Sequence, residues 1–205
     1  MTEQAAYLCV DTETTGLEPE HCAMVEIGAI ALNKRLRPLE GKSATLNLTL
    51  RPDKRVHEIQ AKAIQINGHK WVYNENSQEW KDALPYEEAR EVFHDFIVSH
   101  FPKPKFIVMV GWNVGFDERF LKAMYAYQGE SNVSYGWPFH YHKLDLLAIC
   151  RYLDLRAGRP PRKSYSLEAL SKAYFGDGMA KFAAHTAMGD AQMCLKVLEA
   201  MENDV

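Results

Sequence analysis

Two acidic residues near the N-terminus are spaced as neighbours on one face of a strand. Asp11 and Glu13 follow the β-prone run Tyr7–Val10, and side chains two positions apart on a strand point the same way. Both carboxylates could therefore share one cation. Taken alone, such a pair is usually the solvated start of a loop. The residues Thr14–Leu17 favour a catalytic interpretation of the pair, because hydroxyls, a flexible glycine and backbone amides can bind a phosphate or a sugar.

Two further segments place acids beside predicted helix starts. Asp117 follows an apolar run at 106–110, and Asp190 follows His185 at the start of the last predicted helix. Each has a structural explanation, since the helix dipole favours an acid in the first turn, and a histidine before a helix is more often a cap or a surface residue. Considered separately, these segments leave a structural and a catalytic interpretation open.

Taken together, the three segments resemble the motifs of the DEDD superfamily of 3′→5′ exonucleases, in its histidine subclass. That subclass includes the proofreading subunit of bacterial replicative polymerase and ribonuclease T. The family's motifs occur here in order: DxExTGL as Asp11–Leu17, NxxFD as Asn113–Asp117 and HxAxxDA as His185–Ala191. Weaker similarity in the intervals extends the resemblance over nearly the whole chain. One departure is Trp112, where many members have a histidine, and it alters either packing or base contacts beside the site.

The resemblance implies four metal-ligating carboxylates and one general base. Asp11 would bridge two divalent cations, Glu13 and Asp190 would bind the ion that carries the nucleophilic water, and Asp117 would bind directly or through water. Mg²⁺ or Mn²⁺ is expected, because these hard ions prefer oxygen ligands. Two such ions about 4 Å apart can hold the attacking water and the leaving oxygen of an in-line displacement. His185 would take the proton from that water, since an imidazole exchanges protons near neutral pH.

The same resemblance implies contacts with the substrate around these groups. The expected substrate-binding residues are Thr12, Thr15, Gly16, Leu17, Asn67 and Asn113. The threonines would form hydrogen bonds with the terminal nucleotide, and Leu17 would act as an apolar wedge. Asn113 would orient the carboxylates, and Asn67 with Gly68 would border the base pocket. Asp145 is expected to be a helix N-terminal residue, with support of the metal ligands as the alternative.

Hydrophobic periodicity predicts the elements that must position these side chains. Strands are expected at 7–10, 25–32, 44–50 and 106–111. Helices are expected at 56–66, 86–98, 116–127, 144–153, 167–174 and 186–201, with Ser166 as an N-cap. The segments 74–81 and 157–163 are predicted loops. His140 and His142 have a spacing that could bind a metal, but Phe139 and Tyr141 beside them favour an ordinary strand.

This order of elements predicts one α/β domain over residues 1–205, with a central mixed β-sheet flanked by helices. The resemblance specifies a ribonuclease H-like fold. A chain of 205 residues, 47% of them apolar, is long enough to bury one core and too short for two full domains.

Composition narrows the class of protein further. The formal net charge of −3 excludes a protein that coats nucleic acid by bulk electrostatics, but not an enzyme whose bound cations supply the positive charge. No apolar stretch approaches the roughly 20 residues of a membrane span, and no export signal opens the chain, so a cytoplasmic protein without a membrane partner is expected. The four cysteines lack CxxC spacing, which predicts reduced, buried thiols.

A basic cluster precedes the last two predicted helices. Its members are Arg151, Arg156, Arg159, Arg162 and Lys163, interrupted only by Asp154. It is either a solvated loop or a patch that guides a nucleic-acid strand, in which Tyr165 adds stacking to phosphate contacts.

The predicted function is a 3′→5′ exonuclease that releases nucleoside monophosphates from the 3′ end of single-stranded nucleic acid, with DNA favoured over RNA. One alternative is an RNA-trimming exoribonuclease of the same family, because no motif reports contacts with the 2′-hydroxyl. Another is an inert nucleic-acid-binding module, which predicts damage to the acid set, whereas all five positions are intact. A free-standing enzyme for repair, end trimming or RNA maturation is expected, and the sequence does not distinguish a monomer from a homodimer.

Overall fold

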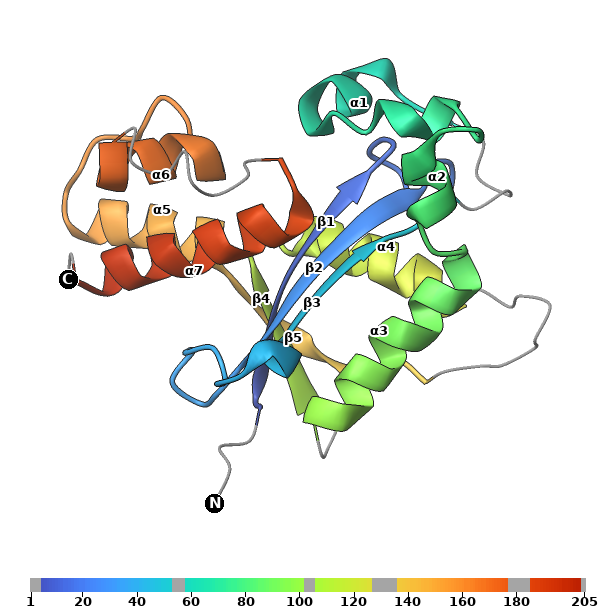
Figure 1. The fold of residues 1–205 in the computed structure, drawn as a ribbon. Coiled ribbons are helices and arrows are strands. Elements are labelled where there is room, and N and C mark those ends of the chain that lie inside the picture. Colours follow the sequence, from blue (N-terminus) through green and yellow to red (C-terminus); the bar gives the residue numbers. More distant parts are fainter. Residues whose placement is uncertain (1–4, 53–57, 102–105, 127–135, 177–184, 204–205) are drawn as a thin grey trace.

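A five-stranded mixed sheet forms the centre of the molecule (Figure 1). The computed structural model describes residues 5–52, 58–101, 106–126, 136–176 and 185–203. The strands lie in the order β3-β2-β1-β4-β5. Their bounds are β1 Tyr7–Thr14, β2 Met24–Leu32, β3 Thr45–Thr49, β4 Ile107–Gly111 and β5 Phe139–Asp145. β1, β2 and β3 pair antiparallel, while β4 is parallel to β1 and β5. The sheet confirms the predicted α/β class with a mixed sheet.

Helices cover both faces of this sheet, because alternate strand residues point to opposite sides. Leu8 and Val10 of β1 belong to a core built with α3 (Tyr86–His100) and α4 (Gly115–Ala126). Cys9, between them, belongs to a second core built with α5 (Leu146–Arg156), α6 (Leu167–Phe175) and α7 (Ala187–Asn203). Every residue of β2 is buried, as expected for a strand covered on both faces.

Shorter elements lie beyond one end of the sheet and join β3 to α3. They are α1 (Ala61–Asn67), the 3₁₀ turn η2 (Lys70–Tyr73) and α2 (Gln78–Asp82), and a further 3₁₀ turn, η1 (Lys42–Ala44), precedes β3. Figure 1 shows α1 and α2 near the end of β1 that faces the start of α7.

The structure corrects four predicted boundaries. β1 continues through Thr14, because residues 11–13 pair with β2. Within the described part of 56–66, the helix begins only at Ala61; Glu58 instead bridges to Cys22, and Gln60 donates its amide to Thr15. The predicted loop 74–81 contains the start of α2, and β5 extends through 145 before α5 begins. Positions 56, 57 and 127 lie outside the described residues.

The remaining elements follow the predictions closely. Ser166 caps α6 by accepting a hydrogen bond from the amide of Ala169 at 3.2 Å. The segment 157–163 contains no helix or strand, and His140 and His142 lie in β5. All four cysteines are buried and free. Among the described residues, none of the helices combines the length and the apolar character needed to cross a membrane.

Candidate active site

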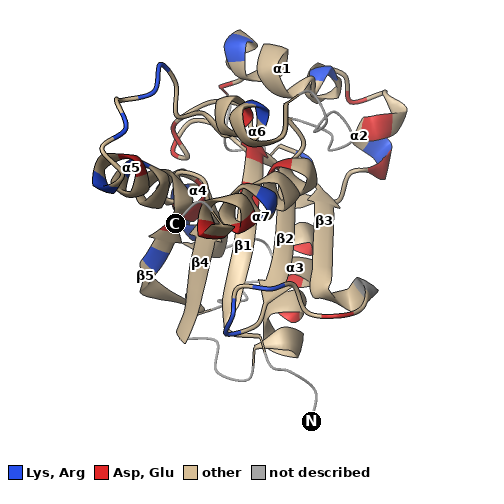
Figure 2. Ribbon diagram, turned by 90° about the vertical axis from the view of Figure 1, so that its left-hand side faces the viewer, with Lys and Arg blue, Asp and Glu red and all other residues tan. Residues whose placement is uncertain are grey.

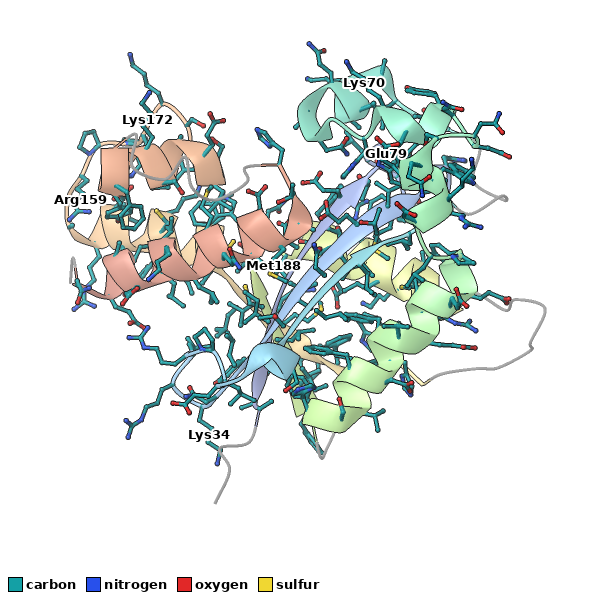
Figure 3. All side chains as sticks on the ribbon, viewed as in Figure 1. Lys34, Lys70, Glu79, Arg159, Lys172 and Met188 are labelled. Atoms are coloured by element: carbon teal, nitrogen blue, oxygen red, sulfur yellow. The ribbon has the colours of Figure 1, made fainter. Side chains whose placement is uncertain are left out.

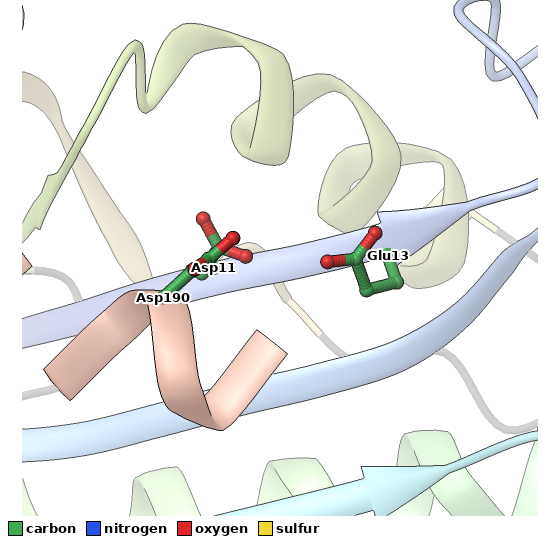
Figure 4. Close-up of side chains that lie close together, drawn as sticks. All are labelled: Asp11, Glu13 and Asp190. Atoms are coloured by element: carbon green, nitrogen blue, oxygen red, sulfur yellow. The ribbon is translucent and has the colours of Figure 1, made fainter. Parts of the chain in front are cut away.

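Three carboxylates converge where α7 begins above β1. One oxygen each of Asp11, Glu13 and Asp190 lies within 4.8 Å of the others (Figure 4). Asp11 and Glu13 project from the same face of β1, as the strand period requires, and Asp190 comes from the first turn of α7. Asp190 is far from Asp11 and Glu13 in the sequence, so packing of α7 on β1 creates the cluster.

A fourth carboxylate, Asp117, approaches β1 from the side of α4. It is only 3% exposed and accepts a hydrogen bond from Oγ1 of Thr12 at 2.8 Å. β4 pairs with residues 7–9 of β1 and no further, so the strand edge beyond Val10 is available to the first turn of α4. The negative charge of Asp117 also raises the pKa of Asp11.

Burial and mutual repulsion make this group of acids hard to ionise together. Burial, followed by the charges of the neighbouring carboxylates, raises the pKa of Asp11 well above its ordinary value. The same two causes raise the pKa of Glu13 to about 8, burial raises the pKa of Asp117 to about 7, and burial also raises that of Asp190. A bound cation removes such repulsion. Clustered carboxylate oxygens of this kind suit hard divalent ions such as Mg²⁺ or Mn²⁺.

A fifth acid, Glu26, lies behind the cluster and was not predicted. It is 4% exposed and is the cross-strand partner of Glu13. Its Oε2 accepts a hydrogen bond from the amide of Ala187, the first residue of α7, at 3.2 Å. Its charge also raises the pKa of Glu13. The sequence signal that could have identified Glu26 is an acid inside the apolar run of β2, because a buried carboxylate needs a hydrogen-bonding or charged partner.

The second partner of Glu26 is His69, whose tautomer follows from its neighbours. Trp71 Nε1 lies 3.1 Å from Nδ1 of His69, and Nε2 of His69 lies 3.2 Å from Oε2 of Glu26. An indole nitrogen only donates, so Nδ1 must accept and the proton resides on Nε2, which donates to Glu26. Hydrogen bonds from His69, which Trp71 orients, and from the amide of Ala187 therefore converge on Oε2 of Glu26 and connect η2 to the start of α7.

His185 lies immediately before α7, on the same segment as Asp190. It is half-buried and adopts a φ of 63°, a left-handed conformation that is uncommon outside glycine. Its imidazole and its backbone amide both lower the pKa of Asp190. Oγ1 of Thr186 accepts a hydrogen bond from the amide of Gly189 at 3.2 Å, which caps the helix. The backbone thus holds the histidine beside Asp190.

The expected substrate contacts of the first motif divide into two groups. Leu17 is 62% exposed, as an apolar wedge requires. The hydroxyl of Thr12 is engaged with Asp117, and Thr15 is fully buried, with its hydroxyl bonded to Glu58 and Ala23. Both hydroxyls are thus engaged within the protein, where they connect β1 and the segment after it to Asp117, Glu58 and Ala23. Their contact with the nucleotide stays a prediction. Gly16 is buried, and a Cβ there would lie 2.4 Å from Sγ of Cys22, so close packing demands glycine.

The two expected asparagines occupy different settings. Asn67, at the end of α1, donates from Nδ2 to the carbonyl of Thr14 at 3.0 Å and lowers the pKa of Glu13 by hydrogen bonding. It therefore borders the carboxylate cluster. Asn113 is exposed with a φ of 56°, and its backbone amide donates to Oδ1 of Asp145. Asp145 also caps α5 through the amide of Leu147, which confirms its predicted place at a helix start.

The departure at Trp112 is a packing feature. Its indole nitrogen donates to the carbonyl of Tyr165 at 2.9 Å, and its ring packs into the core shared by α5, α6 and α7. The side chain therefore ties the end of β4 to the loop that precedes α6.

Comparisons with known proteins agree with this arrangement. Residues 8–198 match the RNase_T family model, which is described as an exonuclease. The chain is 27% identical over 201 residues to the DNA polymerase III subunit epsilon of Treponema pallidum, covering 97% of this chain and 77% of that protein. It is also 27% identical over 195 residues to the PolC-type DNA polymerase III of Thermotoga petrophila, of which it spans only 12%.

Solved structures share the fold at low sequence identity. A structure of exonuclease I superposes with a TM-score of 0.72 at 20% identity, over 98% of this chain and 41% of that chain. Exonuclease I from Methylocaldum szegediense gives a TM-score of 0.71 at 18% identity, over 96% of this chain and 40% of the other. The chain thus spans about two fifths of the exonuclease I structures that it matches, and the predicted ribonuclease H-like fold is confirmed.

Proposed function

Because this chain belongs to the RNase_T exonuclease family, whose model matches residues 8–198, we propose that it removes nucleotides one at a time from the 3′ end of single-stranded nucleic acid, with DNA preferred to RNA. Family membership makes the chain an exonuclease that hydrolyses phosphodiester bonds. The polarity, the strand preference and the use of two cations are the proposed part.

The meeting of Asp11, Glu13 and Asp190 within 4.8 Å, with Asp117 beside Asp11, carries the proposal. These four residues would hold the two cations, Mg²⁺ or Mn²⁺. When bound, such ions supply the positive charge that the attacking water and the departing oxygen of an in-line displacement require. Thr12 keeps the carboxylate of Asp117 in position through its 2.8 Å hydrogen bond.

His185 would accept the proton of the attacking water at its imidazole. The half-buried ring lies on the segment that also carries Asp190, so α7 positions the base and one ligand together. A positioned general base of this type contributes roughly 10²–10⁴-fold to a rate. Leu17 and Asn67 lie at the same end of β1 and would border the terminal nucleotide.

Relatives support the choice of substrate. One relative is a subunit of a DNA polymerase, and E. coli exonuclease I, which matches over 97% of this chain at a TM-score of 0.68, has been solved with the oligonucleotide dT13. Both point to DNA, and the second points to a single strand.

The test is digestion of 5′-labelled DNA and RNA, single- and double-stranded, with Mg²⁺ or Mn²⁺ and with EDTA as control. The expected result is a ladder that shortens one nucleotide at a time and keeps its 5′ label, strongest for single-stranded DNA, and no digestion in EDTA. Immediate release of the label as a mononucleotide, or cleavage at internal positions, would contradict the proposed polarity. A faster reaction on RNA would replace the DNA preference with the exoribonuclease alternative.

A further inference from the structure

A basic hollow of about 450 Å³ lies between the second half of α5 and the loop that leads to α6. Its charged and aromatic lining consists of Arg151, Asp154, Arg159, Arg162, Lys163 and Tyr165. Four of these side chains are basic and one is acidic, which leaves three positive charges at this place in a protein whose formal net charge is −3. Figure 2 shows the basic residues of the α5–α6 loop, and Figure 3 labels Arg159 at its outer end.

The floor of the hollow is a closed network around Asp154. This carboxylate is 2% exposed and accepts hydrogen bonds from Nε and Nη2 of Arg162, at 2.6 and 2.9 Å, and from the hydroxyl of Tyr165 at 3.2 Å. The bonds from Arg162 hold the pKa of Asp154 below its ordinary value. Such a bidentate pair fixes geometry as well as charge. Arg162 therefore supports the loop and is not available to a ligand.

The rim of the hollow is differently built. The guanidinium carbon of Arg151 lies over the face of the Tyr165 ring, 4.9 Å from its centre. Lys163 and Arg159 follow along the loop, and Arg159 approaches Asp154 only at 3.4 Å. A planar guanidinium held beside an aromatic ring offers both a positive charge and a surface on which a base can stack. Single-stranded nucleic acid uses both, through its phosphates and its bases.

The hollow is connected to the active-site segment at two points. Trp112, next to Asn113, donates to the carbonyl of Tyr165, and Asp145, the cap of α5, accepts from the amide of Asn113. The 11 residues of α5 span about 16 Å, at roughly 1.5 Å per residue. The hollow, at the second half of this helix, is therefore displaced along α5 from the Asp145 cap that contacts Asn113.

We propose that this hollow binds the strand several nucleotides before its 3′ end, with Arg151 and Lys163 contacting phosphates and the guanidinium of Arg151 stacking on a base. The proposal rests on the proposed exonuclease function and gives it a second contact with the same strand. It also divides the basic cluster into a structural member, Arg162, and strand-binding members.

The test compares Arg151→Gln/Lys163→Gln with a charge-matched control, Lys34→Gln/Arg35→Gln, at exposed positions of the turn after β2. Both are assayed on 5′-labelled dT20 and dT3 at 50 and 200 mM salt. Each lost phosphate contact with a single strand should reduce the steepness of the slope of log kcat/KM against log salt concentration by about 0.7. For two contacts, kcat/KM on dT20 at low salt should fall by roughly tenfold, whereas dT3 should change less than twofold. The control should behave as wild type on both.

Equal losses on dT20 and dT3, or no loss on either, would overturn the proposal. Arg162→Gln provides a second comparison: it should lower the melting temperature and impair both substrates, because it breaks the network around Asp154. A stable Arg162→Gln protein that loses activity only on dT20 would refute the division of roles.

Fluorescence anisotropy of labelled dT20 in EDTA measures strand binding without turnover. Failure of the exonuclease proposal would appear as no hydrolysis of dT3 by the wild type. The proposed strand binding is tested separately, because it requires only that the binding of dT20 in EDTA depends on Arg151 and Lys163.

Discussion

At the scale of single residues, Asp11 lies among several other acids. Four other acids raise its pKa in addition to burial: Asp117, Asp190, Glu13 and Glu26. Its side chain faces Asp190 from the opposite element (Figure 4). As a proposed metal ligand, Asp11 would therefore lower the stability of the metal-free fold through repulsion from these acids.

Asp11→Asn should therefore separate activity from stability. Turnover should fall by at least roughly 10²–10³-fold, because a preorganised charge that binds the cations is lost. In EDTA the melting temperature should rise, because the substitution removes the repulsion between this carboxylate and its neighbours. The expected rise is about 2–4 °C for each kcal/mol gained. Activity assays at saturating Mg²⁺ and thermal denaturation in EDTA check both results. Near-wild-type turnover would refute the assignment of Asp11 as a metal ligand.

His185→Ala tests the base. The single-turnover rate should fall by roughly 10²–10⁴-fold, while metal-dependent binding of the 3′ end persists, because the carboxylates remain. In the wild type the rate should decline on acidification, since an imidazolium cannot accept a proton. Ionisation of water on the cations produces a similar decline, so the pH profile of the variant is the necessary control. A variant with the wild-type rate and profile would make His185 a structural residue before α7.

At the scale of elements, the approach of α7 to β2 sets the site. A Cβ at Gly28 would lie 2.3 Å from the carbonyl carbon of Ala187 and 2.4 Å from the amide nitrogen of Met188. Both are backbone atoms, so the helix itself would have to move. Met188 marks this end of α7 in Figure 3.

Gly28→Ala should displace the start of α7 and with it Asp190 and His185. Overpacking of this kind typically costs about 1–3 kcal/mol of stability, and a misplacement of about 1 Å can reduce a rate by roughly 10²-fold. Gly115→Ala is the matched control, because a Cβ there meets nothing within 4 Å. It should leave stability unchanged or raise it by up to about 1 kcal/mol, since alanine favours helix. Equal effects of the two substitutions on kcat would mean that the contact at Gly28 does not position the site.

The hydrogen bonds between η2 and α7 predict which nitrogen of His69 carries the proton. Long-range ¹⁵N–¹H spectra should show His69 as the neutral Nε2–H tautomer, because Trp71 donates to Nδ1 and Glu26 accepts from Nε2. Trp71→Phe preserves an aromatic ring but removes the donor. This variant should lose about 0.5–1.5 kcal/mol of stability, because Nδ1 of His69 loses its hydrogen-bond donor. An Nδ1–H tautomer in the wild type would contradict the hydrogen bond from Nε2 of His69 to Glu26.

At the scale of the whole molecule, the acid cluster makes the metal-free fold sensitive to pH. The pKa of Glu13 is raised from 4.5 to about 8 and that of Asp117 from 3.8 to about 7. Between these limits the folded chain holds more protons than the unfolded chain, so the free energy of unfolding falls as pH rises. The melting temperature in EDTA should therefore decrease between about pH 5 and 8. Saturating Mg²⁺ or Mn²⁺ should flatten this dependence, because the ions stabilise the ionised carboxylates; an unchanged slope would indicate that no cation binds there.

The sequence by itself determined the class of fold and the five residues expected to carry the chemistry. Strand and helix periods are local, and the spacing of Asp11 and Glu13 required one face of a strand. The order of the three motifs then identified the family, which the comparisons confirm. Asp145 and Ser166 were also predictable, because a helix cap depends on neighbours within one turn.

Only the tertiary structure decided which polar groups of the motifs and of the basic cluster are bonded within the fold. Thr15 is buried against Glu58, and Arg162 is bound to Asp154, although both are polar residues beside a predicted site. Glu26 reaches Ala187 across 161 positions of sequence. Periodicity assigns a side chain to a face of its own element, but its partner depends on how that element packs against elements distant in the chain. Hydrogen bonds of buried polar groups are therefore settled by packing.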